Sequence, residues 1–579
     1  MSLANLAPGG APAAWRWLIE RVWRLEHAFE RSRAAARPED DTRIRIFFVM
    51  AIFGLAFTVL ALGATWAAVF SKVGGNGYLA STDGARGDLV DRNGQLLAVD
   101  LTHYALYINP KDVWDAKATR KALAKALPQV PAKRLDQVVF ADRRGFLVGG
   151  MTPAEKDAIF DLGLPGVEFE EQAARVYPLG ASAAHFIGFV DKGGKGLSGA
   201  EKALDKPVRE AAAKGPDGAI PLSIDLRVQA ALEDEVRKAA IEFQAKDAVG
   251  IVTNVHTGEI LGLVSYPDYD PNQLSQASAE QMTNHAAASV YEMGSTFKAF
   301  TLAMALDTGK YDLNSMWDAR GPLHYGKFAI HDDEPKGRFL NMKEVFTFSS
   351  NVGAARIALS QGVEGHKAFL RKMGQLDRLR TELPESASPI VPKRWGELNT
   401  VTISFGHGIA VAPLQAVMGI NALVNGGYLI PPTFMKRSES EAAAIAKRVI
   451  KTETSDKMRF LMRLNAEIGT AKTADIKGYY VGGKTGTSEK VINGRYAKKR
   501  VLNSFTAIMP CDDPKYQILI MLDEPQAIPE TKGFITSGWN AVPTGGKVIE
   551  RIAPLLGVEP RFDLPPAERL ILAASRTTQ

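Results

Sequence analysis

The sequence predicts an α+β protein that follows a single N-terminal transmembrane helix. Three observations support this fold class. An uncharged apolar run spans Ile46 to Phe70. From there to about Ser223 the sequence predicts a mixture of short strands and helices. In the second half, predicted strands are followed by a block of helices, more strands and a final helix. At 579 residues the chain is too long for one hydrophobic core, so we expect two or more domains.

The apolar run from Ile46 to Phe70 is long enough to cross a bilayer as a helix. The positive-inside rule places residues 1–45 in the cytoplasm and the rest of the chain on the other side of the membrane. A cleaved signal peptide is the alternative. However, the apolar run is longer than the apolar region of a signal peptide, and the leader is longer than the segment that precedes that region. The arginines that precede the run are Arg16, Arg21, Arg24, Arg31, Arg33, Arg37, Arg43 and Arg45.

The leader carries apolar residues at helical spacing between Trp15 and Phe29, with arginines among them. Such a helix either lies on the membrane face or docks a partner, or the leader is a basic segment that only sets topology. The net charge of +6 is spread along the chain, which fits a protein near an anionic membrane and argues against a nucleic-acid partner. Cys511 is the single cysteine and ends an apolar run, so we expect a structural thiol and no internal disulfide.

Residues 71–225 read as a rigid spacer domain. Asn93-Gly94 stands between two short apolar runs and predicts a tight hairpin. Helices are expected over Ala116 to Leu127 and over Pro153 to Leu162. We find no catalytic constellation in this region of the sequence.

The second domain begins near Leu226 and is expected to contain a largely antiparallel sheet. Two strands are predicted on either side of a turn at 256–259, and three more follow after residue 478, before a closing helix. The expected strands are Ala248 to Val255, Ile260 to Tyr266, Tyr479 to Thr487, Asn503 to Met509 and Tyr516 to Leu522, and the closing helix is Gly546 to Leu556.

A hydroxyl and an amine stand three residues apart at the start of an apolar helix predicted over Ser295 to Asp307. Residues at this spacing share a helix face, so the side chains of Ser295 and Lys298 can meet. The helix has no broad polar face and should be central in its domain. Burial lowers the pKa of a lysine towards that of a useful general base. The pair therefore predicts acyl transfer through a serine ester.

Ser-x-x-Lys is a common pattern, and its weight comes from two motifs that follow it in order. Ser349-Ser350-Asn351 is expected in a short link between a helix over Asn341 to Phe348 and a helix over Val352 to Leu359. Lys484-Thr485-Gly486-Thr487 ends a predicted strand. The three motifs together resemble the signature of penicillin-binding proteins and serine β-lactamases.

Further segments make the resemblance closer. Three segments resemble the pedestal motifs of class B penicillin-binding proteins: Arg86 to Ala98, Arg175 to Pro178 and Gly196 to Glu201. Two later segments, Gly406 to Val411 and Pro413 to Gln415, resemble the cell-division branch, the septal peptidoglycan transpeptidases. Gly469 to Ala471 resembles the short motif that precedes Lys-Thr-Gly in this family.

The resemblance implies an architecture in five parts. A cytoplasmic leader (1–45) and a transmembrane helix (46–70) precede an elongated pedestal of the dimerisation type (71–225). A transpeptidase domain (226–570), with a mostly antiparallel sheet flanked by helices, precedes a short tail (571–579). The resemblance also implies a single-pass protein of the inner membrane at the division septum, with its catalytic domain in the periplasm.

The resemblance implies a reaction and roles for eight residues. Ser295 attacks a D-Ala-D-Ala stem peptide, D-Ala leaves, and the acyl group passes to an amine of a neighbouring peptide. Lys298 is the base, Ser349 and Asn351 complete a proton relay, and Lys484 adds positive charge. Thr485 and Thr487 bind the substrate carboxylate, and Gly486 admits the substrate backbone. The implied partners are stem peptides, β-lactams, a septal glycan polymerase and other division-complex membrane proteins. We expect no cofactor and no metal.

Several alternatives remain open from the sequence. The chain could be a membrane-anchored β-lactamase, a penicillin sensor or a catalytically inactive scaffold. Residues Gly478 to Thr485 also fit the phosphate-loop pattern G-x-x-x-x-G-K-T, although turn residues rather than a helix follow them. His331 to Glu334 looks like a metal cluster, but it has no second set of ligands and reads better as a solvated loop.

Overall fold

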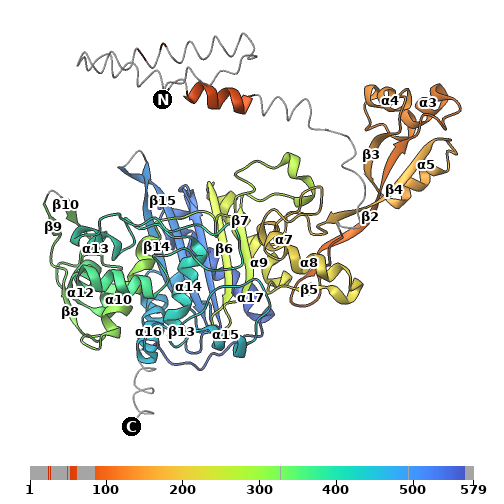
Figure 1. Cartoon of the computed structure of the whole chain (residues 1–579). Coiled ribbons are helices and arrows are strands. Elements are labelled where there is room, and N and C mark those ends of the chain that lie inside the picture. The colour runs from red at the N-terminus through yellow and green to blue at the C-terminus, as the bar shows by residue number, and fades with distance from the viewer. Residues whose placement is uncertain are drawn as a thin grey trace. The chain divides into compact units, whose positions relative to one another are not determined.

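The computed structural model describes residues 24, 27, 49, 52–61, 85–326, 328–492 and 495–567 (Figure 1). Residues 52–61 are helical, and the rest of the predicted span Ile46 to Phe70 lies outside the described residues except for Val49. Among the described helices, none is both long and apolar enough to cross a membrane. Apart from residues 24 and 27, the leader lies outside the described residues, as do the tail 571–579 and Asn493-Gly494.

The described chain forms two compact units, and the smaller one holds residues 105–149 and 157–170. A five-stranded sheet in the order β3-β2-β1-β5, with β4 also paired to β2, is the framework of the predicted spacer domain. The predicted hairpin at Asn93-Gly94 joins antiparallel β1 and β2, and Gly94 has the positive φ, 87°, that such a turn requires. The elements are β1 (Leu89–Val90), β2 (Leu96–Ile108), α3 (Ala116–Ala126), α4 (Ala132–Val139), β3 (Gly145–Met151), α5 (Pro153–Phe160), β4 (Val167–Val176) and β5 (Ile220–Pro221).

The larger unit contains a buried ion network that joins the three pedestal motifs. Glu201, on α7 (Gly199–Ala203), accepts hydrogen bonds from the Arg86 guanidinium at 2.6 Å and from the Arg175 guanidinium at 2.6 Å. Arg86 also pairs with Asp205 at 2.5 Å, and Arg175 pairs with Asp100 at 3.0 Å. The side chains of Arg86 and Glu201 are both fully buried. The motifs therefore hold together segments that are more than 100 residues apart in the chain.

The second domain is built on a fully antiparallel five-stranded sheet in the order β14-β15-β16-β6-β7, which confirms the predicted sheet. β14 and β15 extend beyond the predicted boundaries because the hairpin between them is polar and exposed, so it carries no apolar signal. The strands are β6 (Asp247–Asn254), β7 (Ile260–Tyr266), β14 (Gly482–Ile492), β15 (Arg495–Met509) and β16 (Tyr516–Asp523).

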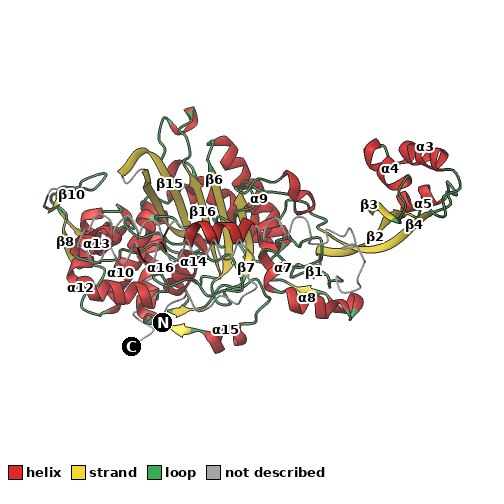
Figure 2. Ribbon diagram, turned by 45° about the horizontal axis from the view of Figure 1, so that its top comes forward, coloured by secondary structure: helices red, strands yellow, loops and turns green. Residues whose placement is uncertain are grey.

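Helices cover both faces of this sheet (Figure 2). Side chains of a strand alternate between its faces, and β6 shows the consequence. Ala248 and Val252 pack with α9 and α17 in one core, whereas Val249 and Ile251 pack with α10, α14 and α16 in the other. α14 is buried along its whole length. The helices are α6 (Ala184–Ile187), α8 (Asp205–Ala212), α9 (Leu226–Glu242), α10 (Lys298–Asp307), α11 (Met342–Thr347), α12 (Asn351–Lys372), α13 (Glu397–Ile403), α14 (Pro413–Val424), α15 (Glu439–Ile445), α16 (Thr452–Ile468) and α17 (Ala541–Leu555).

Replacing Glu201 by Gln should destabilise the protein strongly. The substitution leaves two buried guanidinium groups without their shared counter-ion, and breaking a buried ion pair typically costs about 3–5 kcal/mol. Glu210→Gln is the matched control, since Glu210 forms an exposed pair with Lys206 and its loss should cost at most about 1 kcal/mol. Denaturant unfolding of the full chain measures both values. Equal free energies of unfolding for the two variants would contradict the structural role of the network.

Candidate active site

The serine and lysine of the first motif meet through a 3₁₀ turn rather than through the regular α-helix predicted from Ser295. The turn η5 covers Gly294–Phe297, and α10 begins only at Lys298. Side chains three residues apart eclipse one another in a 3₁₀ turn, closer than they would lie in an α-helix. The Lys298 Nζ lies 2.8 Å from the Ser295 Oγ. The tighter turn thus aligns the pair directly.

Lys298 is completely buried at the start of a helix that is itself buried, as the sequence predicted. Its ammonium donates to the Oγ of Ser295, to the Oγ of Ser349 at 3.0 Å and to the carbonyl oxygen of Ser349 at 2.5 Å. Burial lowers the pKa of Lys298 to about 7, against the opposing charges of Asp333 and Asp332. This amine is therefore far better able to accept a proton at neutral pH than an ordinary lysine.

Lys484 lies on β14 and is also completely buried. Its Nζ donates to the Oγ of Ser349 at 3.0 Å, so the hydroxyl of Ser349 accepts hydrogen bonds from both lysines. Burial and then the charge of Lys298 lower the pKa of Lys484 well below its usual value. We conclude that Ser295, Lys298, Ser349 and Lys484 form one continuous hydrogen-bonded network.

Ser349 adopts an unusual backbone conformation that aims its hydroxyl at the two lysines. Its φ is 55°, in the left-handed region that residues with a side chain rarely occupy. The neighbouring residues fix this turn. Ser350 caps α12 by accepting from the Gly353 N–H, and its hydroxyl donates to Asp332 at 2.7 Å.

Asn351 is oriented by the loop that precedes the motif. Its amide donates to the carbonyl oxygen of His331 at 3.0 Å, and the carboxylate of Asp332 accepts from the Val352 N–H at 2.9 Å. The network of the two lysines is therefore complete without Asn351 in this structure. His331 to Glu334 form an exposed loop as predicted, apart from the half-buried Asp332. The carboxylate of Asp332 caps the first turn of α12, which the sequence did not predict.

The three residues after Lys484 are held by neighbouring segments. The Oγ1 of Thr485 lies 2.7 Å from the Oγ1 of Thr470, and the Oγ1 of Thr487 accepts from the Ser537 N–H at 3.1 Å. A Cβ on Gly486 would lie 2.6 Å from the carbonyl oxygen of Met293. Glycine is therefore required here to let β14 approach the nucleophile turn η5, a reason the sequence did not reveal.

His407 and Glu292 make contacts near this site that no local pattern in the sequence indicates. The ring of His407 stacks on that of Tyr496, with centroids 5.1 Å apart, and burial lowers the pKa of His407 to about 4. His407 is thus a neutral packing residue. The carboxylate of Glu292 accepts from the Gly408 N–H at 2.9 Å. Glu292 lies only three residues before Ser295 in the sequence. That short spacing could have indicated that Glu292 lies near the active site.

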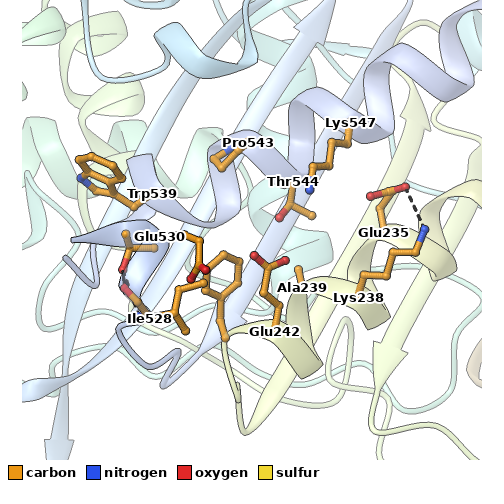
Figure 3. A pocket seen from close by; sticks show the side chains of 12 residues that line it. Glu235, Lys238, Ala239, Glu242, Ile528, Glu530, Trp539, Pro543, Thr544 and Lys547 are labelled. Atoms are coloured by element: carbon orange, nitrogen blue, oxygen red, sulfur yellow. Dashed lines mark hydrogen bonds and ion pairs between the residues drawn. The ribbon is translucent and has the colours of Figure 1, made fainter. Parts of the chain in front are cut away.

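A separate cavity of about 200 Å³ is lined by α9, α17 and the segment from Ile528 to Thr531 (Figure 3). Its lining includes Glu235, Glu242 and Trp539. The eight residues of the three motifs are not among those that line it. The cavity is therefore distinct from the candidate active site.

Comparison with known proteins places both domains in families. Residues 248–537 match the penicillin-binding protein transpeptidase domain, and residues 81–215 match the penicillin-binding protein dimerisation domain. The chain is 56% identical to the probable peptidoglycan D,D-transpeptidase FtsI of Caulobacter vibrioides, over 97% of each chain. It is 29% identical to the peptidoglycan D,D-transpeptidase FtsI of Escherichia coli K12, over 82% of this chain and 84% of that one.

A solved structure shares the fold. Penicillin-binding protein 3 of Mycobacterium tuberculosis, in complex with aztreonam, superposes with a TM-score of 0.63 at 23% identity, covering 84% of this chain and 98% of the other. The chain therefore belongs to the penicillin-binding protein transpeptidase family. Within that family it is a class B D,D-transpeptidase, which pairs the transpeptidase domain with a dimerisation domain.

This membership corrects the alternatives left open by the sequence. The β-lactamase and sensor interpretations are replaced by the transpeptidase assignment. The phosphate-loop interpretation is wrong, because Lys484 and Thr485 lie within an antiparallel strand that continues to Ile492. A phosphate loop instead opens a helix.

Substitution of Ser349 should separate backbone strain from hydroxyl chemistry. Ser349→Ala and Ser349→Gly both remove the hydroxyl, but only glycine occupies the left-handed region without steric cost. We expect Ser349→Gly to have a free energy of unfolding about 1 kcal/mol higher than that of Ser349→Ala. Denaturant unfolding of both variants measures the difference. A more stable alanine variant would show that the turn is not strained.

Proposed function

We propose that the chain crosslinks septal peptidoglycan as a serine D,D-transpeptidase. Ser295 forms an acyl-enzyme with a D-Ala-D-Ala stem peptide, releases D-Ala and transfers the acyl group to an amine of a neighbouring peptide. The observation that carries this proposal is the buried Lys298 amine, with a pKa of about 7, at 2.8 Å from the Ser295 Oγ. The names of the relatives in Caulobacter vibrioides and Escherichia coli support the same substrate.

The geometry supports a path for the proton. The unprotonated amine of Lys298 takes the Ser295 hydroxyl proton as the Oγ attacks the penultimate D-Ala carbonyl carbon. The C–N bond to the terminal D-Ala then breaks, and the leaving amine needs a proton. The Ser349 hydroxyl bridges Lys298 and Lys484 at 3.0 Å to each and can pass that proton on. The acceptor amine reverses these steps when it displaces Ser295.

The strand β14 supports recognition of the substrate carboxylate. The Oγ1 of Thr487 already accepts a backbone N–H from Ser537, so its own proton remains available to donate to a carboxylate. Lys484 and Thr485 lie on the same strand and contribute charge and a second hydroxyl. Gly486 keeps the strand close to the nucleophile turn. Asn351, at the N-terminus of α12, is assigned to the substrate amide by the family resemblance.

The membrane topology is part of the proposal. We assign residues 1–45 to the cytoplasm, 46–70 to a transmembrane helix, 71–225 to the pedestal, 226–570 to the transpeptidase domain and 571–579 to a tail. The arginine-rich leader and the uncharged run from Ile46 to Phe70 support a single-pass protein of the inner membrane at the septum. Small residues such as Gly54 and Gly63 in this run favour contact with a neighbouring helix, which we assign to the septal glycan polymerase.

Acylation by a penicillin should rise with pH between 6 and 8 and then level off. The reactive form of Lys298 is the unprotonated amine, which predominates above its pKa of about 7. Stopped-flow measurement of the second-order acylation rate gives the profile. A rate that is flat across this range would contradict the role of Lys298 as the base.

Penicillin should form its covalent adduct on Ser295 alone. Ser295→Ala should abolish labelling, and Lys298→Arg should slow acylation by at least about a hundredfold, because a guanidinium stays protonated. Mass spectrometry of the labelled peptide identifies the residue, and Lys310→Arg, an exposed lysine on the loop after α10, serves as the control. An adduct on Ser349 or Ser488, or normal acylation of a folded Lys298→Arg variant, would overturn the assignment.

A further inference from the structure

Three side chains that can bind a metal converge at the start of β6, outside the proposed active site. Asp247 is the first residue of β6, and Glu280 and His285 belong to the segment that leads to the nucleophile turn. One ligand atom from each lies within 4.8 Å of the other two. The Nε2 of His285 is 3.6 Å from the Oδ1 of Asp247 and 3.9 Å from the Oε1 of Glu280.

Two of these ligand atoms are buried and lack a hydrogen-bond partner within the part of the chain that the structure describes. They are the Oδ1 of Asp247 and the Nε2 of His285, on residues that are 2% and 5% exposed. An unsatisfied buried polar atom costs about 1–3 kcal/mol, so proteins rarely retain one without a reason. A ligand between the two atoms would satisfy both.

The other side of the His285 ring is arranged as metal-binding histidines require. Its Nδ1 lies 3.0 Å from the hydroxyl of Tyr291 and 3.1 Å from that of Ser289. A ring that donates its Nδ1 proton to a hydroxyl presents the Nε2 lone pair to the carboxylates. The Ser265 hydroxyl also accepts from the His285 backbone N–H at 2.9 Å. The ring orientation is therefore fixed before any ligand arrives.

The charges around the cluster favour a cation. Asp523 pairs in register with Asp247 across β16 and β6, so two buried carboxyl groups lie side by side here. Lys490 pairs with Asp523 at 2.8 Å. Lys246 lies 3.4 Å from Asp247 and 3.5 Å from Glu280, but its side chain is 56% exposed and can turn into solvent. A divalent ion would replace this mobile ammonium with a larger charge.

We propose that Asp247, Glu280 and His285 bind a divalent transition-metal ion of the zinc class, with water completing the coordination. One imidazole nitrogen and two carboxylate oxygens suit zinc better than calcium or magnesium, which prefer oxygen ligands alone. Bonds of about 2.0–2.2 Å in a tetrahedral site place ligand atoms roughly 3.4 Å apart. The observed 3.6 and 3.9 Å need only small side-chain movements to reach that spacing.

The site would cross-link the central sheet to the segment that runs into the nucleophile turn. Tyr291, which contacts His285, also exchanges two backbone hydrogen bonds with Val411. The metal would therefore anchor the chain ten residues before Ser295. The three ligands are spaced 33 and 5 residues apart and match no known metal-binding motif, so no metal was expected from the sequence.

Zinc binding to the detergent-solubilised, chelator-stripped full chain tests the proposal. We expect about one Zn²⁺ per chain, and at least about tenfold weaker binding in His285→Gln and Glu280→Gln. Glu280 is exposed, so its variant should fold and still be labelled by penicillin. His324→Gln, on an exposed strand, is the matched control and should bind zinc as the original does.

Lys246→Gln adds a test with the opposite sign. Removal of the Lys246 ammonium should tighten zinc binding several-fold. The ammonium repels the ion and pairs with two of its proposed ligands, Asp247 and Glu280. Absence of stoichiometric zinc in the original chain would overturn the proposal. Equal binding by the original and His285→Gln, or unchanged binding in Lys246→Gln, would also overturn it, since the ion would then lie elsewhere.

Discussion

The burial of two lysine side chains around one serine hydroxyl is the constraint on which the catalytic domain depends. Lys298 and Lys484 are both fully buried, and the Ser349 Oγ lies 3.0 Å from each Nζ. Water would stabilise two ammonium charges far better than this interior does, so their pKa values fall. The same environment that makes the lysines costly to bury makes Lys298 able to accept a proton.

Holding these groups together requires three backbone segments to approach closely. The nucleophile turn contacts β14 at Gly486 and the loop at Gly406, where a Cβ would lie 2.1 Å from the carbonyl oxygen of Gly294. A side chain at either position would clash with the backbone at the nucleophile turn. These glycines thus act through packing within the protein. Ser349 adopts a strained backbone conformation that directs its hydroxyl towards the two lysines.

Local patterns in the sequence predicted much of this arrangement. Apolar runs located all five strands of the second sheet, and the spacing of Ser295 and Lys298 predicted their contact. The sequence did not reveal the 3₁₀ turn, the left-handed Ser349 or the cap from Asp332, because each depends on contacts with distant segments. The cluster of Asp247, Glu280 and His285 was missed for the same reason, since only the fold brings these residues together.

The protonation state of Lys298 tests the central claim most directly. In the full chain labelled with ¹³C at lysine Cε, the Lys298 resonance can be assigned from its loss in Lys298→Ala and followed as the pH is raised. The account predicts a titration midpoint near 7, as the burial of this amine requires. A resonance that titrates only near the ordinary lysine pKa of about 10.4 would contradict it.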